Sequence, residues 1–484
     1  MDIICNITIE IYKCICYNNL VWLKSAKFTL FVCIFISILV KISFRRIFYM
    51  KTFRGGTHIP DNKQQTANIP IEIMPVVPDY YVSLAQHIGK PAEPIVEVGQ
   101  LVKEGELIAK ASGFVSANIH SPVCGTIVDI GPYKNATGAT TTCIHIKPTG
   151  EGTLGYYEPL NDPTAEQIVA RIAEAGIVGM GGAGFPTAVK LQPKDKVDTL
   201  VINGVECEPY LNCDNRLMLE KPVELLKGIR LIAKALGVSR IYVGIEANKP
   251  QAIQTLLAQD GTAPKATEGS TDIVVVPLKT KYPQGAEKTL IYATTKRKVP
   301  AGGLPSAVGV VVCNVATAYA VYQAVTLGKP LYERVMTVSG NGIKKPQNLL
   351  VRMGTPLKDI VTFCAGLDNC DKLLMGGPMM GKTLVDLSYN LTKTDSGFLA
   401  LHEDEYVSVL PTACIHCGRC VDVCPMHLEP LYIDFYIQVN DTATAVKYGA
   451  LDCFECGTCA FVCPARRPLV QSVRLTKQRH REGK

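Results

Sequence analysis

The stretch CIHCGRCVDVCP at residues 414–425 recurs, with the same cysteine spacing, as CFECGTCAFVCP at residues 453–464. Each copy has three cysteines separated by two residues, a fourth cysteine after three more residues, and then a proline. Bacterial ferredoxins use this run to bind two 4Fe–4S clusters. Zinc sites usually take two spaced CxxC pairs, and disulfide frameworks belong to short secreted chains, so neither alternative fits. The doubled run therefore predicts a helical two-cluster domain.

The expected ligands form two crossed sets. Three thiolates curl around three corners of a cubane, and the next helical turn carries the fourth thiolate to the other cluster. The 414 set is Cys414, Cys417, Cys420 and Cys463, and the 453 set is Cys453, Cys456, Cys459 and Cys424. Two adjacent cubanes form a one-electron wire.

Other residues near the cysteines are not expected to bind the clusters. His416 and His427 are expected beside the ligands or at the surface, and not as ligands. Residues 431–451 are predicted to form an amphipathic connector between the two binding loops. Residues 474–484 are interpreted as a solvated basic tail, with docking on an anionic membrane or an acidic partner as the alternative.

Charge and composition exclude one class of function. Residues 1–49 hold six lysines and arginines against Asp2 and Glu10, so the formal charge of +7 leaves only +3 for the remaining 435 residues. Such a nearly neutral body gives no electrostatic basis for nucleic-acid binding. With 47% hydrophobic and 19% charged residues, the 484-residue chain is predicted to form several globular domains.

Residues 1–49 differ in composition from everything after them. They contain no glycine or proline, whereas the rest carries all 40 glycines and all 30 prolines. Their apolar run of 13 residues, 28–40, is shorter than the roughly 20 that a membrane span needs. Three interpretations stay open: an upstream start codon with Met50 as the true initiator, a weak single-pass anchor, or an uncleaved signal-like segment. The break at Met50 favours the first.

A second dense signal is GIVGMGGAGFPTAVK at residues 176–190. Its small residues let backbone N–H groups approach a phosphate or a flat ring. Residues 163–175 predict a helix before this loop, whereas an ordinary dinucleotide fingerprint follows a strand. The alternation that follows predicts an α/β layer with a parallel sheet, with strands at 199–203, 240–244, 272–277 and 308–314 and helices at 222–236 and 250–258.

The region before this loop predicts a small β sandwich. Residues 93–130 read as short alternating strands with glycine turns. They resemble the barrel-sandwich hybrid of lipoyl and biotinyl carriers, in which a modified lysine sits at a hairpin tip. Residues 111–120 contain no lysine, so a docking scaffold without a swinging arm is expected.

Several motifs together resemble one known family. GMGGAGFPTAVK at 179–190, NGVECEP at 203–209, GAEK at 285–288 and CNVAT at 313–317 look like the flavin domain of the NADH-binding subunit of respiratory complex I. Residues 337–356 resemble a soluble-ligand-binding β-grasp domain. With two cluster runs and KTFRGGTHIP at 51–60, the order is similar to the RnfC family of the Rnf/Rsx ion-translocating electron transport complexes. The resemblance covers residues 50–484.

The resemblance implies FMN and NAD(H) as cofactors besides the two 4Fe–4S clusters. Hydride transfer takes place at the flavin, so no catalytic protein residue is expected, and Glu206 would orient NADH or tune the flavin. The residues carried over are Gly179, Gly181, Gly182, Ala183, Gly184 and Lys190 around flavin and nucleotide, Asn203, Glu206 and Glu208 on the pocket wall, Gly285, Glu287 and Lys288 near the nicotinamide, and Asn314 and Thr317 at the FMN phosphate.

The expected fold class is multidomain α/β. The expected parts are an atypical extension (1–49), a barrel-sandwich-hybrid-like β domain (50–150), a Rossmann-like flavin domain (151–330), a β-grasp domain (331–390) and a helical two-cluster ferredoxin-like domain with a basic tail (391–484).

The expected function is that of a peripheral electron-transfer subunit on the cytoplasmic side of the cell membrane. The resemblance implies NADH, a ferredoxin or ferredoxin-like subunit and the other subunits of a membrane-bound Rnf-type complex as partners. The membrane subunits among them would move the ions. Two alternatives are a soluble flavin/iron–sulfur reductase similar to cobalamin reductase and a non-enzymatic ferredoxin-like relay.

Overall fold

The computed structural model describes residues 50–134, 136–150, 152–267, 270–406 and 410–483. The three interpretations of residues 1–49 fall on residues outside this part. None of the helices in the described ranges combines the length and the apolarity that a membrane span requires.

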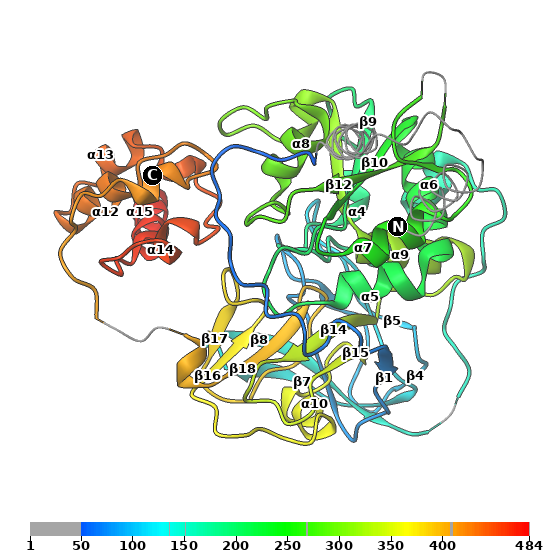
Figure 1. Ribbon diagram of the computed structural model, residues 1–484. Helices are drawn as coiled ribbons and strands as arrows, with labels where there is room; N and C mark the ends of the chain where they lie inside the picture. Colours follow the sequence, from blue (N-terminus) through cyan, green and yellow to red (C-terminus); the bar gives the residue numbers. More distant parts are fainter. Residues whose placement is uncertain (1–49, 135, 151, 268–269, 407–409, 484) are drawn as a thin grey trace, which may run out of the picture. The chain divides into compact units, whose positions relative to one another are not determined.

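A parallel five-stranded sheet occupies the middle of the chain (Figure 1). Neighbouring residues of its strands face opposite sides: Val201 packs with Leu290 on one side, whereas Leu200 and Ile202 belong to the core that includes Ile229 on the other. Because helices cover both faces, the strands are apolar throughout rather than alternating. In spatial order the strands are β11 (Thr262–Ala263), β12 (Ile273–Leu278), β10 (Arg240–Glu246), β9 (Thr199–Asn203) and β13 (Val310–Asn314).

The helices of this layer agree closely with the sequence pattern. A capping box of Thr164 and Gln167 starts α3, and Gly237 at φ 65° ends α6. The 308–314 strand is shorter than predicted, because Pro305–Val308 forms a 3₁₀ turn before β13. The helices are α3 (Ala165–Glu174), α4 (Thr187–Lys190), α5 (Cys213–Glu220), α6 (Pro222–Leu236), α7 (Pro250–Leu257), α8 (Glu287–Thr295) and α9 (Val315–Thr326).

Two small antiparallel sheets precede this layer, as the β-sandwich expectation requires. The four-stranded sheet has the order β2 (Tyr80–Ser83), β8 (Thr140–Pro148), β7 (Gly125–Lys134) and β4 (Leu101–Val102). The three-stranded sheet has the order β3 (Glu93–Pro94), β5 (Leu107–Lys110) and β6 (Ile119–His120).

A mixed six-stranded sheet follows the parallel layer, together with α10 (Leu357–Phe363). One edge strand comes from the early part of the chain, because β1 pairs in parallel with β15. β18 lies beyond residue 390 and pairs with β14, so this sheet spans more of the chain than residues 331–390. The order is β1 (Ile71–Ile73), β15 (Gln347–Arg352), β14 (Glu333–Ser339), β18 (Gly397–Leu401), β16 (Lys372–Met375) and β17 (Lys382–Leu384).

The C-terminal part is helical and corrects the expectation of a solvated basic tail. The predicted connector at 431–451 consists of short helices, because Asn440 at φ 61° ends α12 and the Asp441 carboxylate accepts from Thr444 N at 2.9 Å to start α13. The basic tail is a helix, α15, whose buried Val473 packs in a core with Ile433. The elements are α11 (Arg419–Asp422), α12 (Pro430–Gln438), α13 (Thr442–Lys447), a 3₁₀ turn (Ala450–Asp452), α14 (Thr458–Phe461) and α15 (Leu469–Glu482).

Candidate cofactor sites

The parallel sheet has a topological switch point between β9 and β13. The chain leaves β9 toward β10 and later returns to β13 on the other side of β9. Open α/β sheets bind ligands in the crevice beyond the carboxyl ends of the strands at such a point. Asn203 and Asn314 end the two strands and are register partners. Both therefore lie where a ligand is expected.

The glycine-rich loop packs against the start of α9. Met180 N donates to Thr317 Oγ1 at 3.0 Å, and Thr317 is buried. A Cβ added to Gly181 would lie 2.9 Å from the Asn314 side chain, whereas one added to Gly182 would meet nothing within 4 Å. Gly181 and Gly182 are exposed. The loop thus presents bare backbone next to a helix N-terminus, which is the arrangement that binds phosphate groups.

Asn314 ends β13, caps α9 and donates a hydrogen bond to Asp214. Its Oδ1 accepts from Ala316 N at 2.8 Å and so caps α9. Its Nδ2 donates to Asp214 Oδ2 at 2.7 Å. The side chain that the resemblance assigns to the FMN phosphate is therefore also the N-cap of α9.

Asp214 and Cys213, which the predicted residue set did not include, form a polar cluster with Glu206, which it did include. Ligand atoms of Glu206, Cys213 and Asp214 lie within 4.8 Å of one another. Burial, and then Glu206, raise the pKa of Asp214 to about 7. The available signal was the polar stretch CDNR after NGVECEP, which the parallel sheet brings to the switch point.

Glu206 also stabilises the N-terminus of α5. Its carboxylate accepts from Asp214 N at 2.7 Å and from Asn215 N at 3.3 Å, so it caps the first turn of α5. Among the described residues, Asn215 Oδ1 is buried without a hydrogen-bond partner. A buried polar atom without a partner is costly unless a ligand or water satisfies it.

Four other predicted residues contact one another in two pairs. Lys190 Nζ lies 2.8 Å from Glu287 Oε1, and Asn203 Nδ2 donates to Gly285 O at 2.8 Å. Two residues make their contacts with other segments. Lys288 donates to Pro300 O, and the Glu208 carboxylate accepts from Met379 N at 3.1 Å.

The glycine loop fits the phosphate and ring of a flavin nucleotide. Gly182 offers open space that a Cβ would fill, the α9 N-terminus points backbone N–H groups toward this end of the sheet, and Asn215 Oδ1 is buried without a partner in the described structure. Gly181, Asn314 and Thr317 are the predicted residues that the structure brings together at the start of α9, whereas a Cβ on Gly184 would meet Thr394 and residues 86–87.

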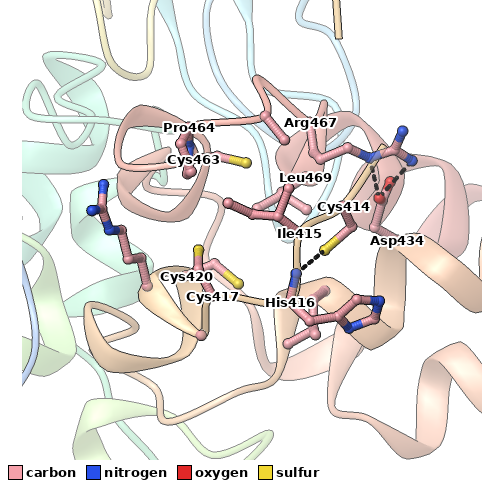
Figure 2. Close-up of a pocket in the computed structure, with 14 residues that line it drawn as sticks. Cys414, Ile415, His416, Cys417, Cys420, Asp434, Cys463, Pro464, Arg467 and Leu469 are labelled. Atoms are coloured by element: carbon pink, nitrogen blue, oxygen red, sulfur yellow. Dashed lines mark hydrogen bonds and ion pairs between the residues drawn. The ribbon is translucent and has the colours of Figure 1, made fainter. Parts of the chain in front are cut away.

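The thiols of the 414 set line one pocket (Figure 2). Cys414 and Cys417 come from the loop before α11, Cys420 from α11, and Cys463 from the second run. Arg467 pairs with Asp434 at 2.8 Å on the wall of this pocket, which holds α12 next to the Cys463 loop. Four thiols around one hollow are the donor set that a cubane needs.

The thiols of the 453 set are also neighbours. Burial first, and then the nearby thiols of Cys456, Cys453 and Cys424, raise the pKa of Cys459. Cys424 precedes Cys453 by 29 residues, so the tertiary fold is what brings it to the second run.

The two runs repeat the same backbone conformation. His416 and Glu455 occupy equivalent positions at φ 54° and 62°, and their N–H groups donate to Cys414 Sγ at 3.4 Å and Cys453 Sγ at 3.3 Å. Gly418 and Gly457 match at φ 75° and 83°. These left-handed turns point backbone N–H groups at the cysteine sulfurs, and such hydrogen bonds would tune the reduction potential of a bound cluster.

The comparisons with known families follow the same order along the chain. The RnfC barrel sandwich hybrid domain matches residues 51–151, the Nuo51 FMN-binding domain 172–323, the SLBB domain 335–383 and the 4Fe-4S dicluster domain 413–466.

Curated relatives match nearly the whole chain. The C subunit of the proton-translocating ferredoxin:NAD(+) oxidoreductase complex of Clostridium ljungdahlii is 46% identical over 89% of this chain and 94% of that protein. The C subunit of the ion-translocating oxidoreductase complex of Rhodobacter capsulatus is 46% identical over 88% of this chain and 82% of that protein. The C subunit of the Na(+)-translocating ferredoxin:NAD(+) oxidoreductase complex of Acetobacterium woodii is 41% identical over 88% and 96%. With this identity over this length, the chain belongs to the RnfC family, the C subunits of ion-translocating ferredoxin:NAD(+) oxidoreductase complexes.

Proposed function

We propose that this chain moves electrons between NAD(H), FMN and two 4Fe–4S clusters as a peripheral subunit of a membrane-bound, ion-translocating complex. The observation that carries the proposal is the presence, in one chain, of a bare glycine loop at the β9/β13 switch point and of two groups of four thiols. Partner subunits would move the ions, with this chain bound peripherally on the cytoplasmic side, as the resemblance to the RnfC family implies.

The residues at the switch point would bind and orient the flavin. Gly181, Gly182 and the N-terminus of α9 would hold the phosphate, and Asn314 and Thr317 would fix the loop around it. When bound, FMN supplies the change from two-electron hydride chemistry to one-electron transfer. Asp214 and Glu206, which lie beside Asn314, would set the local charge.

The cysteines would ligate the clusters in the crossed sets. Cys463 lines the pocket of Cys414, Cys417 and Cys420, and Cys424 lies among the thiols of the second run. Backbone amides at the sulfurs would stabilise the reduced clusters. This arrangement suits an electron wire that starts at the flavin.

Anaerobically purified full-length chain provides the test. We expect one FMN and two 4Fe–4S clusters per chain, and NADH should reduce both clusters as seen by electron paramagnetic resonance. Absence of FMN together with clusters that only dithionite reduces would instead identify a ferredoxin-like relay. A chain that turns over with NADH and a soluble corrinoid and never copurifies with membrane subunits would favour the reductase alternative.

A further inference from the structure

The KTFRGGTHIP motif, residues 51–60, contacts both the parallel-sheet layer and the ferredoxin-like domain; we call it the strap. Lys279 N donates to Lys51 O at 3.0 Å next to the end of β12, and Lys51 Nζ donates to Thr294 O at 3.0 Å in α8. Phe53 is buried under the Lys281 ammonium, whose Nζ lies 4.4 Å from the ring centroid. The first half of the strap is thus fixed to the layer that carries the flavin site.

The second half of the strap meets the cluster-binding loop. Gly56 N donates to Val423 O at 2.7 Å, directly before Cys424. Thr57 and Tyr282 exchange both backbone hydrogen bonds, at 2.8 and 2.9 Å. Gly56 is therefore bonded to the ferredoxin-like domain while its neighbour is bonded to the parallel-sheet layer.

Only glycine fits at the two central positions of the strap. Gly55 and Gly56 have φ values of 81° and 73°, which side chains rarely adopt. A Cβ on Gly55 would lie 2.8 Å from Cys424 O, and one on Gly56 would lie 2.5 Å from Tyr282 O. The close approach of the three segments therefore depends on these glycines.

Tyr282 continues the connection to the second cysteine run. Its hydroxyl donates to Cys456 O at 2.8 Å and lies 3.4 Å from Glu208 Oε1. The Glu208 carboxylate accepts from Met379 N, and Met379 O lies 3.0 Å from the position of a Cβ on Gly457. Tyr282 and Glu208 thereby bring residues 456–457 to the NGVECEP segment, which follows β9 at the switch point.

The 414 set has different surroundings. Every residue that lines its pocket comes from residues 414–469, within the ferredoxin-like domain. Cys414 and Cys417 are exposed. Among the described residues, the 453 set is thus the one tied to the flavin-side layer, and the 414 set is the one open to the outside.

We propose that the strap and Tyr282 position the 453 set on the flavin-binding layer, so that its cluster exchanges electrons directly with the flavin and the cluster of the 414 set exchanges them with a partner; with NADH as donor, the 453 cluster is then reduced first. Each transfer moves one electron, which oxidises the donor and reduces the acceptor, and no bond forms or breaks. The inference rests on the proposed function. Gly55, Gly56 and Tyr282 are positioning residues, because they act through the loop that carries the ligands.

The order of transfer is tested with the full chain and rapid-freeze electron paramagnetic resonance after mixing with NADH. In Cys417→Ala, the cluster of the 453 set should be reduced at the wild-type rate. In Cys456→Ala, dithionite should still reduce the cluster of the 414 set, but NADH should not do so within the wild-type reduction time. Fast NADH reduction of the 414 cluster in Cys456→Ala would overturn the order.

The strap is tested without NADH by hydrogen–deuterium exchange of the holoprotein. Gly56→Ala and the milder Tyr282→Phe should each raise exchange in residues 423–424 and 453–459 while FMN and iron content stay unchanged. Gly237→Ala is the matched control, because Gly237 also has a positive φ of 65° but its Cβ would meet nothing within 4 Å. Unchanged exchange in both variants would disprove the positioning role.

Kinetics complete the test. We expect flavin-to-cluster transfer to slow roughly tenfold in Gly56→Ala, since small displacements of reacting groups cost large factors in rate. If wild-type protein that retains FMN shows no NADH reduction of either cluster, the proposed function fails. The exchange experiment still decides the role of the strap in that case.

Discussion

Lys393 is a buried lysine without an acidic partner in the described structure. Its Nζ donates to Asn118 O and Gly176 O, both at 2.7 Å, so one ammonium joins the small β sheets to the residue that opens the glycine loop. The side chain is fully buried, and this burial lowers its pKa to about 7. Burial, and then Lys393, also lower the pKa of His120.

This pKa predicts a pH dependence of stability. Between about pH 7 and the ordinary lysine pKa of 10.5, the unfolded chain binds one more proton than the folded chain at this site. The contribution of Lys393 to the free energy of unfolding should therefore rise with pH in this window, by up to about 1.4 kcal/mol per pH unit. Lys393→Met should remove that rise.

Thermal unfolding of the holoprotein at pH 7 and pH 9 measures the effect as a difference between wild type and variant. At pH 7 the variant also leaves two buried carbonyls without a donor, at a cost of about 1–3 kcal/mol each. Lys196→Met is the control, because Lys196 is exposed. Equal pH slopes for wild type and Lys393→Met would contradict the prediction.

At the scale of elements, the glycine loop depends on the first turn of α9. Thr317 anchors the loop by accepting from Met180 N, and Asn314 lies against Gly181 while it caps the helix. A substitution at Gly181 would therefore disturb the protein itself, whereas Gly182 has open space around it. The two neighbouring glycines can be separated by experiment.

We expect Gly182→Val to fold with unchanged iron content and to lose FMN. The branched side chain meets nothing in the protein within 4 Å of its Cβ, so it can obstruct only a bound flavin. FMN released after denaturation, measured by fluorescence, reports the loss. Gly113→Val is the control, since its Cβ would meet only Lys90 Cβ at 3.8 Å. Full FMN retention in Gly182→Val would remove this loop as the flavin site.

At the scale of the whole molecule, the two cysteine runs depend on the packing between them. α12 packs on α15, and Asp434 in α12 binds both Arg467 and Ser472 after the second run. This packing places Cys463 in the pocket of the first run. Arg474 and Lys477 of α15 pair with Glu455 at 2.8 Å, so the basic end of the chain fixes the second loop.

We expect Cys463→Ala to damage the cluster of Cys414, Cys417 and Cys420, although Cys463 belongs to the other run. Loss of one thiolate leaves an open iron, so the cluster should convert to a three-iron form or be lost. Iron analysis and electron paramagnetic resonance detect the change, and Cys424→Ala should do the converse. A variant Cys463→Ala that alters only the cluster of Cys453, Cys456 and Cys459 would show that each run holds its own cubane.

Local sequence patterns were sufficient to predict most helices and strands of the parallel layer and the family of the chain. The strands and helices of the parallel layer follow from apolar runs, caps and glycine stops, as at Thr164 and Gly237. The family prediction is confirmed by relatives that match nearly the whole chain. The exact division of the 431–451 connector could not be predicted, because a left-handed Asn440 and an Asp441 cap separate α12 from α13, and hydrophobic periodicity does not register such a break.

The chemistry of the chain can be predicted from its sequence, because metal ligands, glycine loops and strand patterns consist of residues close together in the chain. Contacts between distant residues follow from the packing of the fold. It brought Asp214 to Asn314, turned Glu208 toward Met379 and Tyr282, and laid Gly55 and Gly56 against Cys424 and Tyr282. Contacts between residues far apart in the chain depend on how packed layers fill space, and spacing along a sequence does not encode that.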